Sequence, residues 1–361
     1  MSEFARTLVE AIRRDGPMRL DRYMERCIAH YYATRDPFGA RGDFVTAPEV
    51  SQMFGELIGV WCASTYEVMG SPKRLLLVEL GPGRGTLMAD LLRAAKVAPR
   101  FLDAVEVHLV ETSPTLRERQ AEALRDREVH WHESLDTVPH GPIILVANEF
   151  FDALPVRQLV RRGDAYHERF VEAGEEVTLR IVEEGTPVSP VLVPAFAAAA
   201  GEGETVEISP ARDDVARAIG KRLSRHSAAL LAIDYGHVAS ACGDTLQALS
   251  QHQYANVLDA PGDADLTAHV DFQALGEALA AAGAAVLPPM TQGAFLLAMG
   301  LREREAALKR NADARGRLQI AAQAQRLAAE GQMGHLFKVL VATHPEVPPP
   351  YPFTPASQGS T

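Results

Sequence analysis

Three glycines at alternate positions directly follow a run of apolar residues. They lie in the segment Leu77-Val78-Glu79-Leu80-Gly81-Pro82-Gly83-Arg84-Gly85-Thr86-Leu87. Glycine permits positive φ angles and a close approach of the backbone to a ligand, which the strand-to-helix loop of a cofactor site requires. A dinucleotide fingerprint needs a further glycine at position 86, where this chain has threonine. The carboxylate of Glu79 can attract a methionine ammonium, so the segment favours S-adenosylmethionine.

Two further strand ends carry groups that suit an adenosine. Glu111 ends the segment His108-Leu109-Val110-Glu111, and a carboxylate at the end of a strand can accept both ribose hydroxyls. Ser134 and Leu135 follow the next apolar run, where we expect the adenine. Glycine triplets alone often mark a structural turn, but their combination with these residues indicates an adenosyl cofactor. The predicted cofactor-binding residues of this sheet edge are Glu79, Gly81, Gly83, Gly85, Glu111, Ser134 and Leu135.

The segment Asn148-Glu149-Phe150-Phe151-Asp152-Ala153-Leu154-Pro155 carries an amide, two carboxylates and two aromatic rings after another apolar run. In a doubly wound sheet this strand end lies at the crevice where an acceptor atom would meet the methyl group. We predict Asn148, Glu149 and Asp152 as catalytic residues, because two carboxylates can hold a guanidinium bidentately. The alternatives are that Asp152 caps a helix and that both phenylalanines belong to the core.

Two other polar segments have open interpretations. Asp234-Tyr235-Gly236-His237 either lines the acceptor pocket or forms a simple exit turn. In the following segment Asp271 suits the N-cap of a helix. The histidines and acids near positions 132 and 269 match no standard zinc spacing, so we predict no metal site.

The elements that must position these residues alternate between apolar strands and helices from residue 74 onward. Such alternation predicts an α/β fold with a doubly wound sheet of seven strands, covered by helices on both faces. The predicted strands are Leu75-Leu80, Val105-Val110, Glu128-Trp131, Ile143-Asn148, Ala229-Asp234, Ala285-Pro288 and Leu336-Thr343.

Other segments extend this core. Residues 2–32 predict two amphipathic helices, and Thr46-Ala47-Pro48-Glu49 predicts a capping box before a helix from Val50 to Met69. Insertions follow the fourth and fifth strands at 156–208 and 240–267, and the first holds antiparallel strands at Arg169-Val171 and Val177-Val182. We therefore divide the chain into an N-terminal helical region and lid (1–72), a catalytic domain (73–344) and a flexible tail (345–361).

The bulk composition excludes several protein classes. The chain has 361 residues, of which 47% are hydrophobic and 23% charged, and its formal charge is −11. This negative charge disfavours a nucleic-acid partner, and no apolar run is long enough to span a membrane. Three widely separated cysteines fit a reducing interior. Because the first residues resemble no signal or Arg-rich transit segment, we expect a cytoplasmic, bacterial protein.

Four sequence blocks resemble the signature blocks of the MidA family over nearly the whole chain. They are Gly42 to Gln52, Glu79 to Met88, Asn148 to Pro155 and Ala264 to Phe272. The resemblance implies a class I methyltransferase fold and transfer to an arginine nitrogen. For the mitochondrial member it implies symmetric dimethylation of a respiratory complex I subunit, which makes a protein, and such a subunit, the expected partner. It also implies that Thr46 belongs to a lid over the cofactor.

Two alternatives remain open at this stage. The acceptor could be a small molecule or another protein nitrogen, because the sequence does not define it. The chain could also be a non-catalytic assembly factor that keeps the adenosyl fold as a binding module. Glu149 and Asp152 favour an enzyme, because a scaffold would need no acceptor carboxylates.

Overall fold

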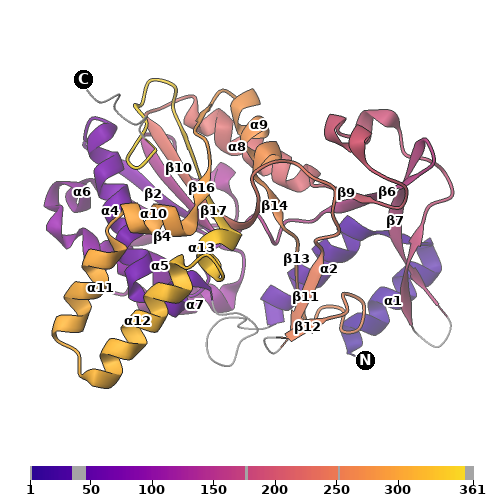
Figure 1. Cartoon of the computed structure of the whole chain (residues 1–361), viewed down its shortest axis with the longest axis horizontal. Coiled ribbons are helices and arrows are strands. Elements are labelled where there is room, and N and C mark those ends of the chain that lie inside the picture. Colours follow the sequence, from indigo (N-terminus) through magenta and orange to yellow (C-terminus); the bar gives the residue numbers. More distant parts are fainter. Residues whose placement is uncertain (1, 35–45, 175–177, 251–252, 354–361) are drawn as a thin grey trace.

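The computed structural model describes residues 2–34, 46–174, 178–250 and 253–353. The predicted glycine-rich loop before Thr46 lies outside these ranges. Within them, a nine-stranded sheet forms the centre of the molecule, and a path of seven strands crosses it in the order β15-β17-β10-β5-β2-β3-β4 (Figure 1). These strands are β2 (Leu75–Leu80), β3 (Val105–Val110), β4 (Val129–His132), β5 (Ile143–Asn148), β10 (Ala228–His237), β15 (Ala285–Val286) and β17 (Phe337–Thr343).

The sheet has two strands that were not predicted. Two short strands, β14 (Val270–Asp271) and β16 (Met290–Thr291), pair with β10 and β17, so the sheet has nine strands where the sequence predicted seven. The five strands from β4 to β10 are parallel, and β17 runs antiparallel to β10. The register aligns Leu80 with Val110 and with Ala147, so the residues after β2, β3 and β5 emerge at one edge.

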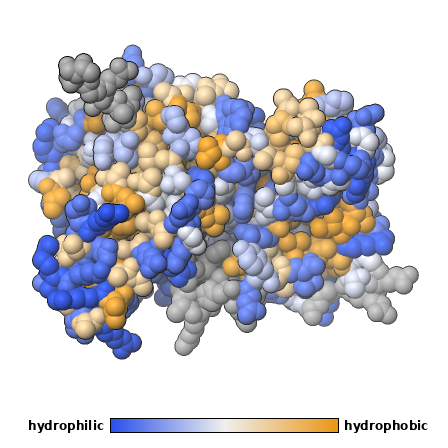
Figure 2. Space-filling view, viewed as in Figure 1, coloured by the Kyte–Doolittle hydropathy of each residue, from blue (hydrophilic) through white to orange (hydrophobic). Residues whose placement is uncertain are grey.

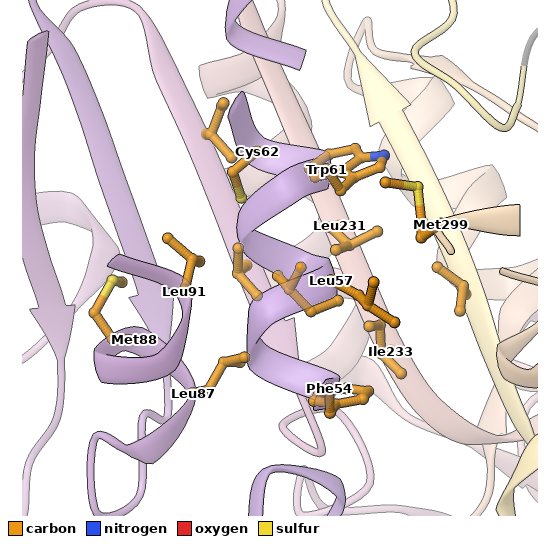
Figure 3. Packing of buried hydrophobic residues seen from close by; sticks show 14 of the residues in the cluster. Phe54, Leu57, Trp61, Cys62, Leu87, Met88, Leu91, Leu231, Ile233 and Met299 are labelled. Carbon is orange, nitrogen blue, oxygen red and sulfur yellow. The ribbon is translucent and has the colours of Figure 1, made fainter. Parts of the chain in front are cut away.

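Helices cover both faces because successive side chains of a strand point to opposite sides. Leu75 and Leu77 join one buried cluster, whereas Leu76 and Val78 join the other. Two of the helices on the first side are α4 (Gln52–Val68) and α5 (Thr86–Ala94), and α8 (Pro210–Leu223) and α9 (Phe272–Ala281) lie on the second. Figure 3 shows the α4 side chains Phe54, Leu57 and Trp61 close to Leu231 and Ile233 of β10 and to Met299.

The remaining helices connect or extend these layers. A hairpin of α11 (Leu301–Arg310) and α12 (Ala314–Ala328) projects from the body, and hydrophilic residues cover most of it (Figures 1 and 2). The helices are α6 (Pro99–Ala104), α7 (Pro114–Ala123), α10 (Gln292–Ala298), α11 (Leu301–Arg310), α12 (Ala314–Ala328) and α13 (Met333–Leu336), with 3-10 turns at Ala95–Val97, Leu135–Thr137, Pro190–Leu192 and Ala195–Ala199.

The first insertion forms a separate five-stranded sheet with the N-terminal segment. β1 (Met18–Arg19), between α1 (Glu3–Asp15) and α2 (Leu20–Thr34), pairs with the insertion strand β7. The predicted strand Arg169-Val171 lies within β7, and the described part of Val177-Val182 overlaps β8, whereas β6 and β9 were not predicted, since polar residues interrupt their apolar pattern. The insertion strands are β6 (Arg157–Arg162), β7 (Ala165–Ala173), β8 (Leu179–Glu183) and β9 (Thr205–Ile208).

The second insertion, for which no strands were predicted, also contains strands. They form a three-stranded sheet that packs with α1 and α2, and its strands are β11 (Gln247–Ser250), β12 (Gln253–Ala255) and β13 (Asp265–Thr267). The N-terminal helices therefore share a hydrophobic cluster with both insertions, while α4 belongs to the central core. The predicted boundary at residue 72 does not separate these packing units.

Two local predictions were wrong. The predicted capping box does not form, because Glu49 accepts a hydrogen bond from the Thr86 hydroxyl (2.6 Å) and Thr46 makes no side-chain cap. The chain instead forms a short α3 (Ala47–Val50) and restarts at α4, which Ser51 caps. The first part of the expected flexible tail is also packed, with Val347 and Phe353 buried in the core.

Gly59 allows α4 and α5 to approach closely. A Cβ atom on Gly59 would lie 2.6 Å from the backbone oxygen of Leu91, which cannot rotate away. We expect Gly59→Val to destabilise the fold by about 1–3 kcal/mol through overpacking, measured as a lower urea midpoint. Gly185→Val is the control, since its Cβ would meet nothing within 4 Å. Equal midpoints for the two variants would contradict this account of the contact.

Candidate functional site

The glycine loop after β2 takes the conformation for which glycine is suited. Gly81, Gly83 and Gly85 have φ angles of 63°, 53° and 80°. A Cβ on Gly81 would lie 3.0 Å from the ring of Phe150, in the loop after β5. The loop therefore turns sharply and keeps its backbone accessible between β2 and α5.

Glu79 lies at the end of β2 with an unsatisfied acceptor. The residue is 2% exposed, and its Oε2 atom has no hydrogen-bond partner among the described residues. Burial raises the pKa of this carboxyl to about 8. A buried acid without a partner is costly, so the site suits a ligand that brings a cationic donor.

Glu111 is connected to the glycine loop by a residue that the sequence analysis missed. Its Oε2 accepts a hydrogen bond from Gln120 (3.1 Å), which also donates to the Gly83 carbonyl (2.7 Å). Gln120 is fully buried, and its own oxygen accepts a hydrogen bond from Trp131 (2.9 Å). The Glu111 Oε1 atom accepts from the backbone nitrogen of Ser113 (2.8 Å). A glutamine on α7 has no sequence signal of its own, because its partners depend on tertiary packing.

Two adjoining cavities lie along this edge of the sheet, and Gly81, Gly83 and Glu149 line both. The smaller cavity is also lined by Thr46, Glu49, Glu79 and Asn148, among others. The larger cavity, of about 500 Å³, is lined by Glu111, Ser134 and Leu135 among others. The structure thus brings all eight predicted cofactor residues to this edge, with Gly85 in the loop between β2 and α5.

Helix α2, from the N-terminal segment, forms part of the wall of the larger cavity. The lining residues that it contributes are Ile28, Ala29, Tyr32 and Ala33. The Tyr32 hydroxyl donates a hydrogen bond to Asp265 of β13 (3.2 Å), which links α2 to the second insertion. The amphipathic pattern of this segment predicts a helix but does not indicate which element its outer face meets.

Glu149 lies in a strained backbone conformation at the junction of the two cavities. Its φ angle is 50°, which is unusual for a residue with a side chain and is often found at functional sites. Its Oε1 atom accepts hydrogen bonds from the Ala47 backbone nitrogen (3.1 Å) and the Asn148 amide (3.2 Å). Burial, with the nearby Asp152 carboxylate as a second cause, raises the pKa of Glu149 to about 7.

Asp152, the second predicted acceptor carboxylate, lies deeper than Glu149. It is 5% exposed and lines neither of the two cavities. Its Oδ1 atom is buried without a hydrogen-bond partner among the described residues, and burial raises its pKa. Asp152 does not cap a helix, which was the alternative prediction, since no helix begins at this residue. Of the two phenylalanines, Phe151 is fully buried and Phe150 lines the larger cavity.

The loop after β5 is held by two buried charged residues. Asp234 accepts hydrogen bonds from the backbone nitrogens of Phe151 (2.9 Å) and Asp152 (3.2 Å). Arg212 of α8 donates to the carbonyls of Phe151 (2.7 Å), Asp152 (3.4 Å), Ala268 (2.8 Å) and His269 (2.7 Å). Arg212 was not predicted as a site residue, and Asp234 was predicted to line the acceptor pocket or to form an exit turn rather than to hold this loop.

No group of three or more histidines, cysteines and acids is placed to hold a metal ion within the described ranges. In the histidine cluster of the sheet edge, His108 and His132 instead hydrogen-bond each other (2.9 Å). Across the same ranges, no helix has the length and apolar character needed to cross a membrane.

Comparison with known proteins identifies the class. The family model for S-adenosyl-L-methionine-dependent methyltransferases matches residues 57–290, and the chain belongs to this family. It is also similar to the mitochondrial protein arginine methyltransferase NDUFAF7 of Xenopus laevis, at 35% identity over 92% of this chain and 82% of the relative. The human NDUFAF7 protein is 35% identical over 82% of this chain and 73% of that protein. The predicted family, enzyme class and cofactor are confirmed.

A solved structure supports the fold. The chain is similar to a Burkholderia thailandensis protein bound to S-adenosyl-homocysteine, with a TM-score of 0.83 and 30% identity over 94% of this chain and 92% of that one. The expectation of a cytoplasmic location is wrong by these comparisons, because the named relatives are mitochondrial proteins. The Burkholderia structure is compatible with a bacterial protein.

Proposed function

We propose that this methyltransferase transfers the methyl group to an arginine guanidinium of a protein. The observation that carries the proposal is Glu149, a carboxyl with positive φ that lines both cavities beside Asn148. A carboxylate is the side chain that best binds a guanidinium. The relatives named protein arginine methyltransferases support the same acceptor.

The cofactor roles follow from charge and hydrogen-bonding capacity. Glu79 has a buried acceptor atom for the methionine ammonium, and Thr46 lines the same smaller cavity. Glu111 offers carboxylate oxygens to the ribose hydroxyls, and Ser134 and Leu135 line the adenine end of the larger cavity. The backbone of Gly81, Gly83 and Gly85 allows the close approach that all three groups require.

The protein contributes alignment and proton transfer. S-adenosylmethionine, when bound, supplies a methyl group on a positively charged sulfur, which is a good leaving group. The enzyme therefore mainly has to align the acceptor nitrogen, the methyl carbon and the sulfur, and such alignment can lower the barrier by about 7–11 kcal/mol. Ionised Glu149 orients the guanidinium and accepts the proton that the attacking nitrogen loses. Asn148, whose Oδ1 atom is buried without a partner in the described ranges, can accept a second guanidinium N–H. The nearby Asp152 carboxyl contributes to the raised pKa of Glu149.

The proposal is tested by mapping methyl groups. The purified enzyme is incubated with S-adenosylmethionine and an extract of cells that lack it, and a Gly83→Val enzyme serves as the control. Methylarginine in a protein, absent from the control, supports the proposal. The proposal extends to symmetric dimethylation of a respiratory complex I subunit, which the MidA resemblance implies. Methyl groups only on small molecules or other residues would contradict the arginine acceptor, and no methylation would favour a scaffold.

We expect Glu111→Ala to weaken S-adenosylmethionine binding by roughly tenfold to a hundredfold. The ribose hydroxyls lose a charged acceptor, and one hydrogen bond to a charged group contributes about 1.5–3 kcal/mol, which corresponds to a factor of this size. The dissociation constant from titration calorimetry checks this result. Glu122→Ala, on an exposed face of α7, is the control. Unchanged affinity in Glu111→Ala would remove Glu111 from the cofactor site.

We expect kcat to rise with pH through about 7 and then to level off. The raised pKa of Glu149 means that the carboxyl is protonated below this value and cannot accept a proton, so the rate is lost as the pH falls. A pH profile of kcat between about pH 5.5 and 9 measures this rise, and its midpoint is expected at about pH 7. A profile that is flat across pH 6–8 would contradict the role of Glu149 as the proton acceptor.

A further inference from the structure

A third cavity, also of about 500 Å³, lies between the central domain and the first insertion. It shares no lining residue with the two cofactor cavities. Its walls come from α8, α9, β9, the segment before β9 and the segment after β10. Among its lining residues are Val156, Phe196, Ile208, Arg212, Asp213, Arg217, His237, Leu275, Glu277 and Ala281.

Only a thin wall separates this cavity from the cofactor site. Leu154 lines the larger cofactor cavity and Val156 lines the third, and two residues of extended chain span at most about 7 Å. Helix α8 also separates the two cavities, since Val215 lines the larger cofactor cavity and Asp213, two residues before it, lines the third cavity. Arg212 lines the third cavity and holds the carbonyl of Phe151 in the loop after β5. A ligand in the third cavity therefore lies close to the larger cofactor cavity and to the loop after β5.

The lining is apolar with an excess of acidic groups. Four carboxylates line it, from Glu207, Asp213, Asp271 and Glu277, against two guanidiniums, from Arg212 and Arg217, and two imidazoles, from His237 and His269. Glu207 accepts hydrogen bonds from Thr245 and Leu246, and Asp271 accepts one from the Ala274 nitrogen (3.0 Å). Arg212 is engaged with four backbone carbonyls.

The rim keeps this acidic character. Arg217 contacts Asp213 (3.5 Å) and Asp214 (2.9 Å), while Glu277 is exposed on α9. Apolar surface from Phe196, Ile208 and Leu275 lies beneath. This chemistry fits a basic side chain with an apolar neighbour.

We infer that the third cavity binds the part of the protein substrate that flanks the acceptor arginine, through a basic and an adjacent apolar side chain. The inference rests on the proposed function, because it assumes a protein acceptor. It assigns a purpose to the first insertion, whose segment around Phe196 forms a wall of the cavity and contributes no strand to the central sheet in the described residues. The site would select substrates without contacting the methyl group.

The inference is tested with two variants at the rim of the cavity. Ala281→Trp narrows the opening at an exposed position, and Glu277→Lys reverses an exposed charge. The probe is a synthetic peptide that spans the methylated residue found by the mapping experiment. We expect KM for this peptide to rise about tenfold in each variant, with kcat and S-adenosylmethionine affinity unchanged.

Matched controls carry the same changes elsewhere. Ala306→Trp and Glu330→Lys alter exposed residues that line none of the three cavities, and KM should stay at the wild-type value. Unchanged KM in both rim variants would overturn the inference, as would a loss of cofactor affinity in both. Should either rim variant fail to fold by circular dichroism, the other decides the result.

A crosslinking experiment locates the bound segment directly. A photoreactive benzoylphenylalanine replaces Phe196 in the cavity wall, and the same residue at the exposed Val191 is the control. Crosslinks from position 196 to peptide residues next to the methylated residue support the inference, and crosslinks from position 191 alone overturn it. A methylated lysine with the same crosslinks would contradict the arginine acceptor but keep the docking site. Methylarginine without crosslinks at position 196 would support the arginine acceptor but contradict the docking site.

Discussion

Glu149→Gln is expected to lower kcat by about 10²–10⁴ while changing S-adenosylmethionine affinity little. Glutamine keeps the size of the side chain and can still accept from the Ala47 nitrogen, so the loop should keep its conformation. It cannot accept a proton, and it loses the charge that holds a guanidinium. Single-turnover methylation of the mapped acceptor, together with calorimetric cofactor binding, measures the two quantities separately.

Asp152→Asn is the informative comparison for this variant. The sequence pattern predicts that both carboxylates hold the acceptor, whereas the geometry assigns the contact to Glu149, since Asp152 lines neither cofactor cavity. We therefore expect Asp152→Asn to lower kcat much less than Glu149→Gln. Equal losses of kcat in the two variants would support binding of the guanidinium by both carboxylates. A Glu149→Gln enzyme with wild-type kcat would remove the proton acceptor from the proposed mechanism.

The sequence predicted the central strands well because burial on both faces leaves a continuous apolar run. β2, β3 and β5 have the predicted bounds, and the others on the seven-strand path differ by a few residues at their ends. Apolar runs of this kind require no knowledge of partners. The short strands β14 and β16 have two residues each, and only pairing with β10 and β17 defines them.

The candidate site was predictable where its residues follow a strand directly. Gly81, Glu111 and Glu149 each come after a parallel strand, so a topological rule places them together. Gln120, Tyr32 and Arg212 could not be found in this way, because each acts from a helix through contacts with distant segments. The depth of Asp152 was equally hidden, since the sequence does not reveal how far a loop turns inward.

Arg212 and Arg222 offer a matched test of how α8 supports the site. Both are buried on the same helix, and both donate only to backbone carbonyls in the described hydrogen bonds. Arg212 holds the loop after β5 at Phe151 and Asp152. Arg222 holds the segment after β4, through Leu135 (3.0 Å), Val138 (2.7 Å) and Pro139 (2.7 Å). The two loops have different proposed roles, in methyl transfer and in adenine binding.

Arg212→Lys should reduce the free energy of unfolding by about 3–5 kcal/mol, because a single ammonium cannot satisfy four carbonyls and the nearby Asp234 loses a guanidinium neighbour. Urea unfolding measures this loss. The folded fraction should show a lower kcat with near-normal cofactor affinity, whereas Arg222→Lys should weaken cofactor binding and leave kcat nearly unchanged. If both variants changed the same kinetic constant, α8 would stabilise the edge of the sheet as one unit, and Arg212 would have no separate effect on the transfer loop.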